Sequence, residues 1–203
     1  MKRNKHYINR LLPRKYRKFG LALSALLFAA TMITTSLTAG SDTNYAVLQR
    51  ISDGDTFVFR SSTKGEFTCR AHAIDTPETF GGNKLQRDAK ACGVGLSTMK
   101  AAGEAATTYA KNMLKIGKSY KVSTREKDRY GRYICEIHKA GIDLPTYNQA
   151  IVKDGYAVAY MKYIKSPQDK RLFEKLQTEA KHNKNGLWKS NPKLMQCLAN
   201  EAK

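Results

Sequence analysis

A two-residue alternation of side chains predicts five short strands within residues 41–203. Phe57 and Phe59 fall on the same face of one predicted strand, because successive side chains of a strand point to opposite faces. The same rule places Cys69, Ala71 and Ala73 together on one face of another strand. The predicted strands span 47–51, 56–60, 67–74, 119–124 and 132–138.

A longer period of 3.6 residues predicts helices in the second half of the chain. The first spans 97–116, with an apolar stripe made of Met99, Ala102, Ala106, Tyr109, Met113 and Ile116. A short helix follows over 144–154, where Gly155 can end it. The last helix begins with Ser166, Pro167 and Asp169 at the N-cap, N1 and N3 positions and runs to about residue 182.

The order of these elements predicts an α+β fold with five strands and three helices. Five short strands can close into a small β-barrel, an architecture that commonly binds oligonucleotides. Residues 79–96 are rich in glycine and polar side chains, which predicts a loop between the third strand and the first helix.

Residues 1–40 have the layout of an export signal. Eight basic residues and no acidic ones precede an apolar run from about Phe19 to Thr34, and small residues follow at Thr38-Ala39-Gly40. The run from Gly20 to Ala39 approaches the roughly 20 residues that span a bilayer, so an uncleaved membrane anchor is the alternative. In both cases the remainder is exported: it is secreted or periplasmic if the leader is cleaved, and membrane-anchored if it is kept.

The charge of the chain points to a polyanionic partner. The 203 residues include 36 Lys and Arg against 17 Asp and Glu, a net charge of +19. Without residues 1–40, 28 basic residues still face 17 acidic ones. Neutralising the phosphates of a nucleic acid releases counterions, which favours binding to such a chain. The alternative is that the positive charge only keeps the protein soluble and that no polyanion binds to it.

Four cysteines are consistent with export to an oxidising compartment. They are Cys69, Cys92, Cys135 and Cys197, which allow three pairings. None has the CxxC spacing of a zinc or redox site, so a thiolate metal site is set aside. Structural disulfides and buried free thiols both remain open at this point.

Four acidic residues gather at the ends of two predicted strands. They are Asp53, Asp55, Asp75 and Glu78. Taken one at a time, each fits ordinary turn chemistry, as in Asp-Gly and Asp-Thr-Pro. Together, in an otherwise basic chain, they fit a site for a hard cation such as calcium or magnesium, which prefers several oxygen ligands.

Two arginines accompany the acidic cluster. Arg70 lies eight residues before Glu78, and Arg132 follows Gly131. A planar guanidinium group can bind phosphate oxygens in a bidentate way. A cation, two arginines and a free carboxylate together could attack a phosphodiester, since the positive groups stabilise the transition state and the carboxylate takes a proton from water.

Three separate blocks carry a resemblance to a known family. They are Ile51-Ser52-Asp53-Gly54-Asp55-Thr56, Arg70-Ala71-His72-Ala73-Ile74-Asp75-Thr76-Pro77-Glu78-Thr79 and Asp128-Arg129-Tyr130-Gly131-Arg132. In order and spacing these blocks resemble the thermonuclease, or staphylococcal nuclease-like, family. The resemblance covers about 45–188 and implies a five-stranded OB-fold-like β-barrel with three helices.

The resemblance also implies a role for each matched residue. Asp55 and Asp75 would bind Ca²⁺ through their carboxylates, and Thr76 through its backbone carbonyl. The implied catalytic residues are Arg70, Glu78 and Arg132, with Glu78 as general base and the arginines on the scissile phosphate. The implied substrate-binding residues are Arg129, Tyr130 and Tyr160, the two tyrosines at positions that border a nucleotide base.

The activity that the resemblance implies is hydrolysis of DNA and RNA at the 5′-oxygen, which leaves 3′-phosphates. The alternative is a nuclease-like domain of the cell envelope that binds nucleic acid without cutting it, since such folds can lose ligands and keep the barrel. All the matched residues are present, which favours the enzyme. Nucleic acid is the expected partner, and no protein partner is evident.

Two segments depart from the family pattern. About a dozen extra residues follow Glu78, and the tail lies beyond the core resemblance. The predicted organisation is a leader over 1–40, a thermonuclease-like domain over 41–190 and a C-terminal tail over 191–203. A further hypothesis pairs Cys92 of the insertion with Cys197 of the tail, while Cys69 and Cys135 share an inward face and either pair or simply pack.

Overall fold

The computed structural model describes residues 42–139 and 145–203 of the chain. The predicted leader over 1–40 lies outside these residues. Within the two described ranges, no helix is long and apolar enough to span a membrane.

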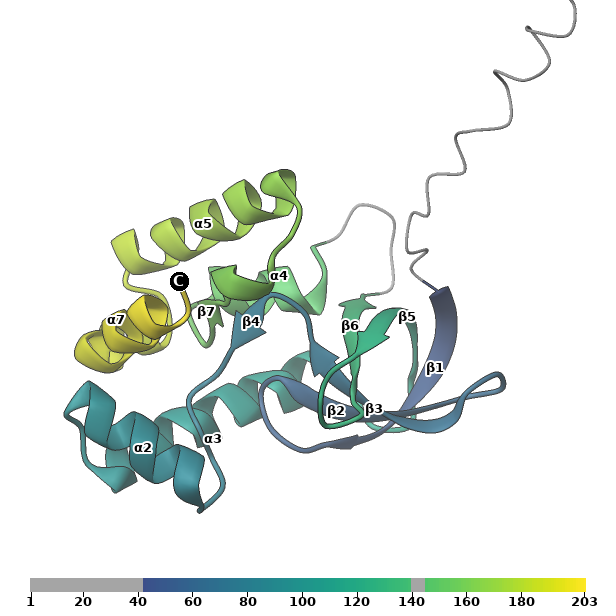
Figure 1. The fold of residues 1–203 in the computed structure, drawn as a ribbon, viewed down its shortest axis with the longest axis horizontal. Helices are drawn as coiled ribbons and strands as arrows, with labels where there is room; N and C mark the ends of the chain where they lie inside the picture. Colours follow the sequence, from purple (N-terminus) through teal and green to yellow (C-terminus); the bar gives the residue numbers. More distant parts are fainter. Residues whose placement is uncertain (1–41, 140–144) are drawn as a thin grey trace, which may run out of the picture. The chain divides into compact units, whose positions relative to one another are not determined.

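Five strands form a closed barrel, as predicted (Figure 1). They are β1 (Asp42–Ile51), β2 (Thr56–Ser61), β3 (Gly65–Ala71), β5 (Ser119–Lys127) and β6 (Tyr133–His138). The order is β1-β2-β3-β6-β5, and the first strand also pairs with β5, which closes the barrel. Only the β3–β6 pair is parallel among these strand pairs of the described residues. The predicted α+β fold with a five-stranded barrel is therefore confirmed.

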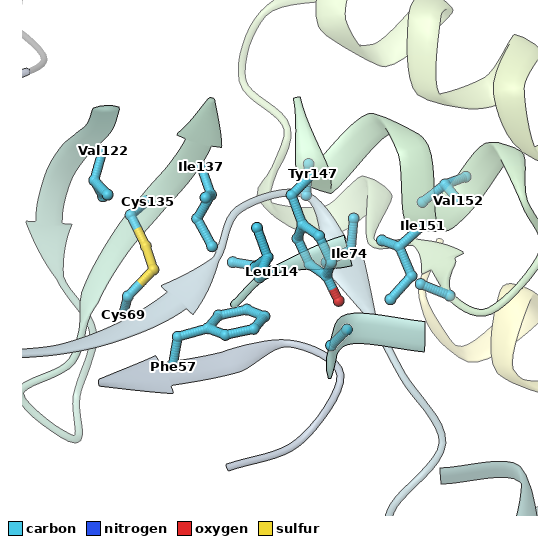
Figure 2. Packing of buried hydrophobic residues seen from close by; sticks show 14 of the residues in the cluster. Phe57, Cys69, Ile74, Leu114, Val122, Cys135, Ile137, Tyr147, Ile151 and Val152 are labelled. Atoms are coloured by element: carbon cyan, nitrogen blue, oxygen red, sulfur yellow. A yellow bond between two sulfur atoms is a disulfide. The ribbon is translucent and has the colours of Figure 1, made fainter. Parts of the chain in front are cut away.

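The predicted alternation places the large apolar side chains inside the barrel. Phe57, Phe59 and Cys69 are fully buried. Cys69 and Cys135 form a disulfide across the β3–β6 pair, with their Cα atoms 5.8 Å apart (Figure 2). Tyr147, at the start of α4 (Tyr147–Lys153), meets the ring of Phe57 edge-on at 5.2 Å between centroids, so this helix closes one end of the barrel core.

The third strand ends earlier than predicted. Strand β3 stops at Ala71, and Ala73 has a φ of +65°, which no regular strand accommodates. The chain then forms β4 (Ile74–Asp75), which pairs antiparallel with β7 (Val158–Ala159) in a separate two-stranded sheet. The prediction of one strand over 67–74 is thus wrong at its end. The turn places Asp75 on a different sheet from Arg70.

The predicted helices are present with shifted ends. They are α3 (Leu96–Met113), α4 and α5 (Pro167–His182). The Ser166 side chain caps the last one by accepting a hydrogen bond from the Asp169 backbone N–H. In the stripe of α3, Met99, Ala102 and Ala106 are buried as predicted. Ile116 lies beyond the helix end and is exposed, so its assignment to the stripe is wrong.

The segment predicted as a loop contains a helix, and so does the tail. They are α2 (Asn83–Cys92) and α7 (Pro192–Glu201), accompanied by the short η3 (Met161–Tyr163) and α6 (Leu187–Ser190). Helix α2 packs against α3 and α7 (Figure 1). Its buried residues Leu85, Ala89 and Cys92 join a second apolar cluster with residues of α7. Cys92 and Cys197 form a disulfide there, with Cα atoms 5.4 Å apart.

Replacing Asn148 with alanine should lower the free energy of unfolding by about 3 kcal/mol. The fully buried Asn148 side chain donates to the carbonyl oxygens of His72 (2.9 Å) and Cys135 (3.1 Å) and accepts from the Ile137 N–H (3.2 Å). Alanine leaves these three backbone groups without that partner. Urea denaturation measures the change, with Thr178→Ala on the exposed side of α5 as control; equal midpoints would contradict the prediction.

Candidate active site

A buried carboxylate stands at the start of β2. Asp55 ends the β1–β2 turn, and its side chain is almost fully buried. Its Oδ2 atom accepts hydrogen bonds from the Thr76 backbone N–H at 3.1 Å and from the Thr76 hydroxyl at 3.0 Å. The same oxygen lies 3.2 Å from Nη2 of Arg70. The first two predicted blocks therefore meet at this atom.

Arg70 connects the barrel to the small sheet. Its Nη2 atom donates to Asp75 Oδ1 at 2.8 Å while it pairs with Asp55. Its Nη1 atom donates to the carbonyl oxygens of Ala71 (3.1 Å) and Ile74 (2.9 Å). One guanidinium group thus fixes the turn between β3 and β4. It also brings two predicted metal ligands to within 3.2 Å of the same nitrogen.

Burial raises the pKa of two of the three carboxylates near Arg70. Burial, followed by the charge of Asp55, raises the pKa of Asp53 to about 7. Burial also raises the pKa of Asp75 to about 6, against the opposing charge of Arg70. Burial resists ionisation of Asp55 as well, but the charge of Arg70 and the hydrogen bonds from Thr76 help to hold its pKa below the usual value. A bound cation would favour the ionised form of all three carboxylates.

Two glycines permit the close packing of this site. A Cβ atom at Gly54 would lie 2.9 Å from Cγ2 of Thr76. A Cβ atom at Gly103, in the middle of α3, would lie 2.6 Å from the backbone carbonyl of Glu78. Helix α3 therefore rests directly on the backbone that carries Glu78. A glycine inside a helix lowers its stability. The glycine at position 103 of the predicted helix was therefore a sequence signal that could have indicated a close backbone contact there.

Glu78 has a partner that the sequence did not predict. Lys84, in the first turn of α2, donates a hydrogen bond to Oε1 of Glu78 and lies 3.3 Å from Oδ2 of Asp88. Partial burial works against the charged form of Lys84, but Asp75 and Glu78 outweigh that effect and raise the pKa of Lys84 above its usual value. Because residues 79–96 were predicted as a loop, no spacing argument could place Lys84 at this site.

Arg132 stands in a second group of residues, on the hairpin between β5 and β6. Its Nε and Nη2 atoms both lie 2.7 Å from Oδ2 of Asp128. The exposed ring of Tyr130 stacks against the guanidinium groups of Arg129 at 4.8 Å and Arg132 at 5.3 Å. In the described part of the chain, no hydrogen bond or ion pair joins Arg132 to Asp55, Arg70 or Asp75. The structure thus places the predicted residues in two groups.

The comparisons with known proteins decide the family. Residues 68–190 match the sequence profile of the family described as "Staphylococcal nuclease homologue", which is more than half of the chain. The chain belongs to the staphylococcal nuclease family. It is also similar to the endonuclease YhcR of Bacillus subtilis (strain 168), with 29% identity over 154 residues. The match covers 74% of this chain but 12% of that protein, so the chain spans a small part of its relative's length.

Membership of the staphylococcal nuclease family supports nuclease-type, hydrolytic chemistry on nucleic acid. The predicted family resemblance is confirmed, although the matched range begins after the block 51–56. The barrel itself brings that block to the others, because Thr56 of β2 lies opposite Arg70 of β3 in the strand register. The structure therefore adds Asp53 and Asp55 to the part of the site that the family match covers.

Tyr160 lies next to the Asp55–Arg70–Asp75 group. It follows β7, and its backbone N–H donates to the carbonyl oxygen of Ala73 at 2.8 Å. With Asp75 and Lys84 it lines a hollow of about 250 Å³ between α2 and α7. The remaining lining residues are Arg87, Asp88, Ala91, Cys92, Lys162, Leu198, Glu201 and Ala202. Tyr160 is therefore near the predicted metal ligands, while Arg129 and Tyr130 lie with Arg132.

The predicted metal ligands fit a hard cation only with the help of water. Within residues 42–139 and 145–203, no three or more His, Cys, Asp or Glu side chains form a group that could hold a metal ion. The predicted set is smaller, with the carboxylates of Asp55 and Asp75 and the carbonyl oxygen of Thr76. Calcium takes six to eight oxygen ligands and accepts water among them. Two adjacent carboxylates and a carbonyl oxygen suit such an ion when water completes its ligand shell.

Proposed function

We propose that this member of the staphylococcal nuclease family is a calcium-dependent nuclease. It hydrolyses phosphodiester bonds of DNA and RNA at the 5′-oxygen and leaves 3′-phosphates. The observation that supports the proposal is that one nitrogen of Arg70, Nη2, pairs with the carboxylates of both Asp55 and Asp75 and so holds them close together. Calcium, held by Asp55, Asp75 and the Thr76 carbonyl, would supply positive charge that polarises the scissile phosphate.

Glu78 is the proposed general base. Its side chain is one-quarter exposed, so water can reach it, and Gly103 fixes the backbone that carries it. The carboxylate takes a proton from the attacking water as the oxygen–phosphorus bond forms. The bond to the 5′-oxygen then breaks, the leaving oxygen takes up a proton from solvent, and Glu78 returns its proton to solvent.

The two arginines are the proposed phosphate ligands. Planar guanidinium groups match phosphate oxygens and stabilise the charge that gathers on them in the transition state. Arg132 would approach with Tyr130 and Arg129, whose exposed ring and positive charge suit a nucleotide next to the scissile phosphate. Tyr160 would border a base on the other side of Asp75.

Export is part of the proposal. Disulfides persist in oxidising compartments, and the described residues contain two, Cys69–Cys135 and Cys92–Cys197. Together with the signal-like residues 1–40, they support a secreted or periplasmic protein, or a membrane-anchored one if the leader is kept. N-terminal sequencing of the mature protein distinguishes cleavage from anchoring. A mature chain that begins at Met1 and is recovered from the membrane fraction would indicate an anchor.

Removing calcium should lower the rate of cutting by at least about a hundredfold, because the positive charge on the phosphate is lost. The purified chain is incubated with single- and double-stranded DNA and with RNA, in Ca²⁺ and in excess chelator. The ends of the products are then tested for 3′-phosphates. Full activity in chelator would contradict the calcium requirement, and binding without cutting in Ca²⁺ would favour a non-catalytic nucleic-acid-binding domain.

A further inference from the structure

The inserted helix α2 contributes a charged face to the active site. Residues Leu85, Ala89 and Cys92 bury one side of the helix in the second apolar cluster. Lys84 and Asp88, one turn apart, lie on a different face and line the hollow that contains Asp75 and Tyr160. Helix α2 is thus a wall of the site and not a distant addition.

We propose that Lys84 is a further substrate-binding residue of the active site, which contacts the non-bridging oxygens of the scissile phosphate. The inference rests on the proposed function, because it takes Glu78 as the base. Lys84 hydrogen-bonds Oε1 of Glu78, and its side chain remains 44% exposed. Its ammonium group is therefore both next to the base and open to a ligand.

The position of Glu78 fixes how far Lys84 must reach. A general base lies about 3 Å from the water that it deprotonates, and that water lies about 3 Å from the phosphorus before attack. A group that is hydrogen-bonded to the base therefore lies no more than about 9 Å from the phosphorus. A lysine side chain has a flexible stem with four carbons and can cover that gap without movement of α2.

Lys84 adds a positive charge to a site whose two arginines already pair with carboxylates. Arg70 donates to two carbonyl oxygens and pairs with two carboxylates, and Arg132 pairs with Asp128. The Nη2 atom of each arginine is already paired with a carboxylate. Lys84 keeps a second carboxylate, Asp88 at 3.3 Å, when it turns from Glu78 to the substrate. Glu78 is then released to act as a base at the moment the phosphate arrives.

The disulfide between Cys92 and Cys197 positions Lys84. Lys84 precedes Cys92 by eight residues, which is about 12 Å along the helix. The bond joins the end of α2 to α7, and Nζ of Lys193 also donates to the Gly93 carbonyl oxygen at 3.1 Å. Without the bond, α2 would depend on three buried side chains and a few polar contacts. Loss of the disulfide should therefore weaken the Lys84 contact without touching the residue itself.

The test measures binding to a phosphate that cannot be cut. The probe is a thymidine dinucleotide with methylene in place of the bridging 5′-oxygen, titrated in Ca²⁺ into the full chain. Lys84→Gln should weaken binding about tenfold, because a charge-assisted hydrogen bond is lost. Lys84→Arg should stay within about threefold, and Lys90→Gln, on the exposed side of α2, should not change the affinity. A Cys92→Ala/Cys197→Ala double variant should weaken binding in the same direction as Lys84→Gln.

A neutral probe separates a phosphate contact from a structural role. When the probe phosphate carries a methyl group in place of its charged oxygen, Lys84→Gln should bind it as the wild type does. Equal or tighter binding of the charged probe by Lys84→Gln would overturn the proposal and make Lys84 only a partner of Glu78. Wild-type chain that binds the charged probe but cuts no DNA would contradict the proposed function, while the role of Lys84 in binding would still be decided by the variants.

Discussion

Glu78→Gln is expected to lower kcat by about a thousandfold and to leave the affinity for uncleaved DNA within about twofold. Glutamine keeps the size of the side chain but cannot take a proton from water. The backbone of Glu78 is fixed by Gly103 and not by its carboxylate, so the fold around it should survive. Lys84 would retain Asp88 as a partner at 3.3 Å.

The control for this variant is Glu104→Gln. Glu104 is an exposed residue of α3 whose carboxylate lies 3.8 Å from Nζ of Lys100. Single-turnover cutting of a labelled oligonucleotide in Ca²⁺ gives the rate, and filter binding in chelator gives the affinity. If Glu78→Gln and Glu104→Gln both cut at the wild-type rate, Glu78 is not the base.

Local signals in the sequence were sufficient for much of the fold. Phe57 and Phe59 showed the inward face of β2, and Ser166 with Pro167 marked the start of α5, because these signals act within one strand or one helical turn. The three motif blocks identified the family for the same reason. Each block keeps its residues close in sequence, and the barrel then brings Asp55 to Arg70.

Long-range contacts account for what the sequence did not predict. The predicted pairing of Cys92 with Cys197 is present in the structure, but the sequence did not predict that Cys92 ends a helix, because α2 has only three buried side chains. Strand β4 has two residues, and it exists because Ile74 and Asp75 pair with β7. Propensity and periodicity describe neighbours along the chain, so they could not predict either element.

Contacts between residues far apart in the sequence were also not predictable at the candidate site. The roles predicted for Asp55, Asp75, Arg70 and Glu78 required only that these residues be present and close. Their mutual contacts were not predictable, since Arg70 reaches both carboxylates only after the turn at Ala73. Lys84 was missed because its contact depends on a helix that itself depends on the tail.

Arg70→Lys is expected to lower kcat/KM by about a thousandfold or more and to weaken calcium binding about tenfold. The guanidinium group bonds two carbonyl oxygens through Nη1 and two carboxylates through Nη2. A single ammonium nitrogen has three donors in a different geometry and cannot occupy both positions. Asp55 and Asp75 would then separate, so the predicted calcium ligands would no longer face one ion.

The matched control is Arg60→Lys, on the neighbouring strand β2, where an exposed arginine pairs with Glu66 at 3.1 Å. Calorimetry measures calcium affinity, and cutting of single-stranded DNA measures kcat/KM. Thermal unfolding shows whether the variant has simply lost its fold. Wild-type calcium affinity and activity in a folded Arg70→Lys variant would contradict the role assigned to Arg70.

The contacts of Arg70 also imply that calcium and substrate bind cooperatively. Nη2 of Arg70 pairs with the same carboxylates, Asp55 and Asp75, that would hold the ion. Calcium held by these oxygens would take up part of their negative charge, so the guanidinium group of Arg70 would attract a phosphate more strongly. Calcium should therefore raise the affinity for the uncleavable dinucleotide, and by linkage the dinucleotide should raise the affinity for calcium by the same factor. In Arg70→Lys this coupling should disappear, and an unchanged coupling factor would show that Arg70 does not link the two sites.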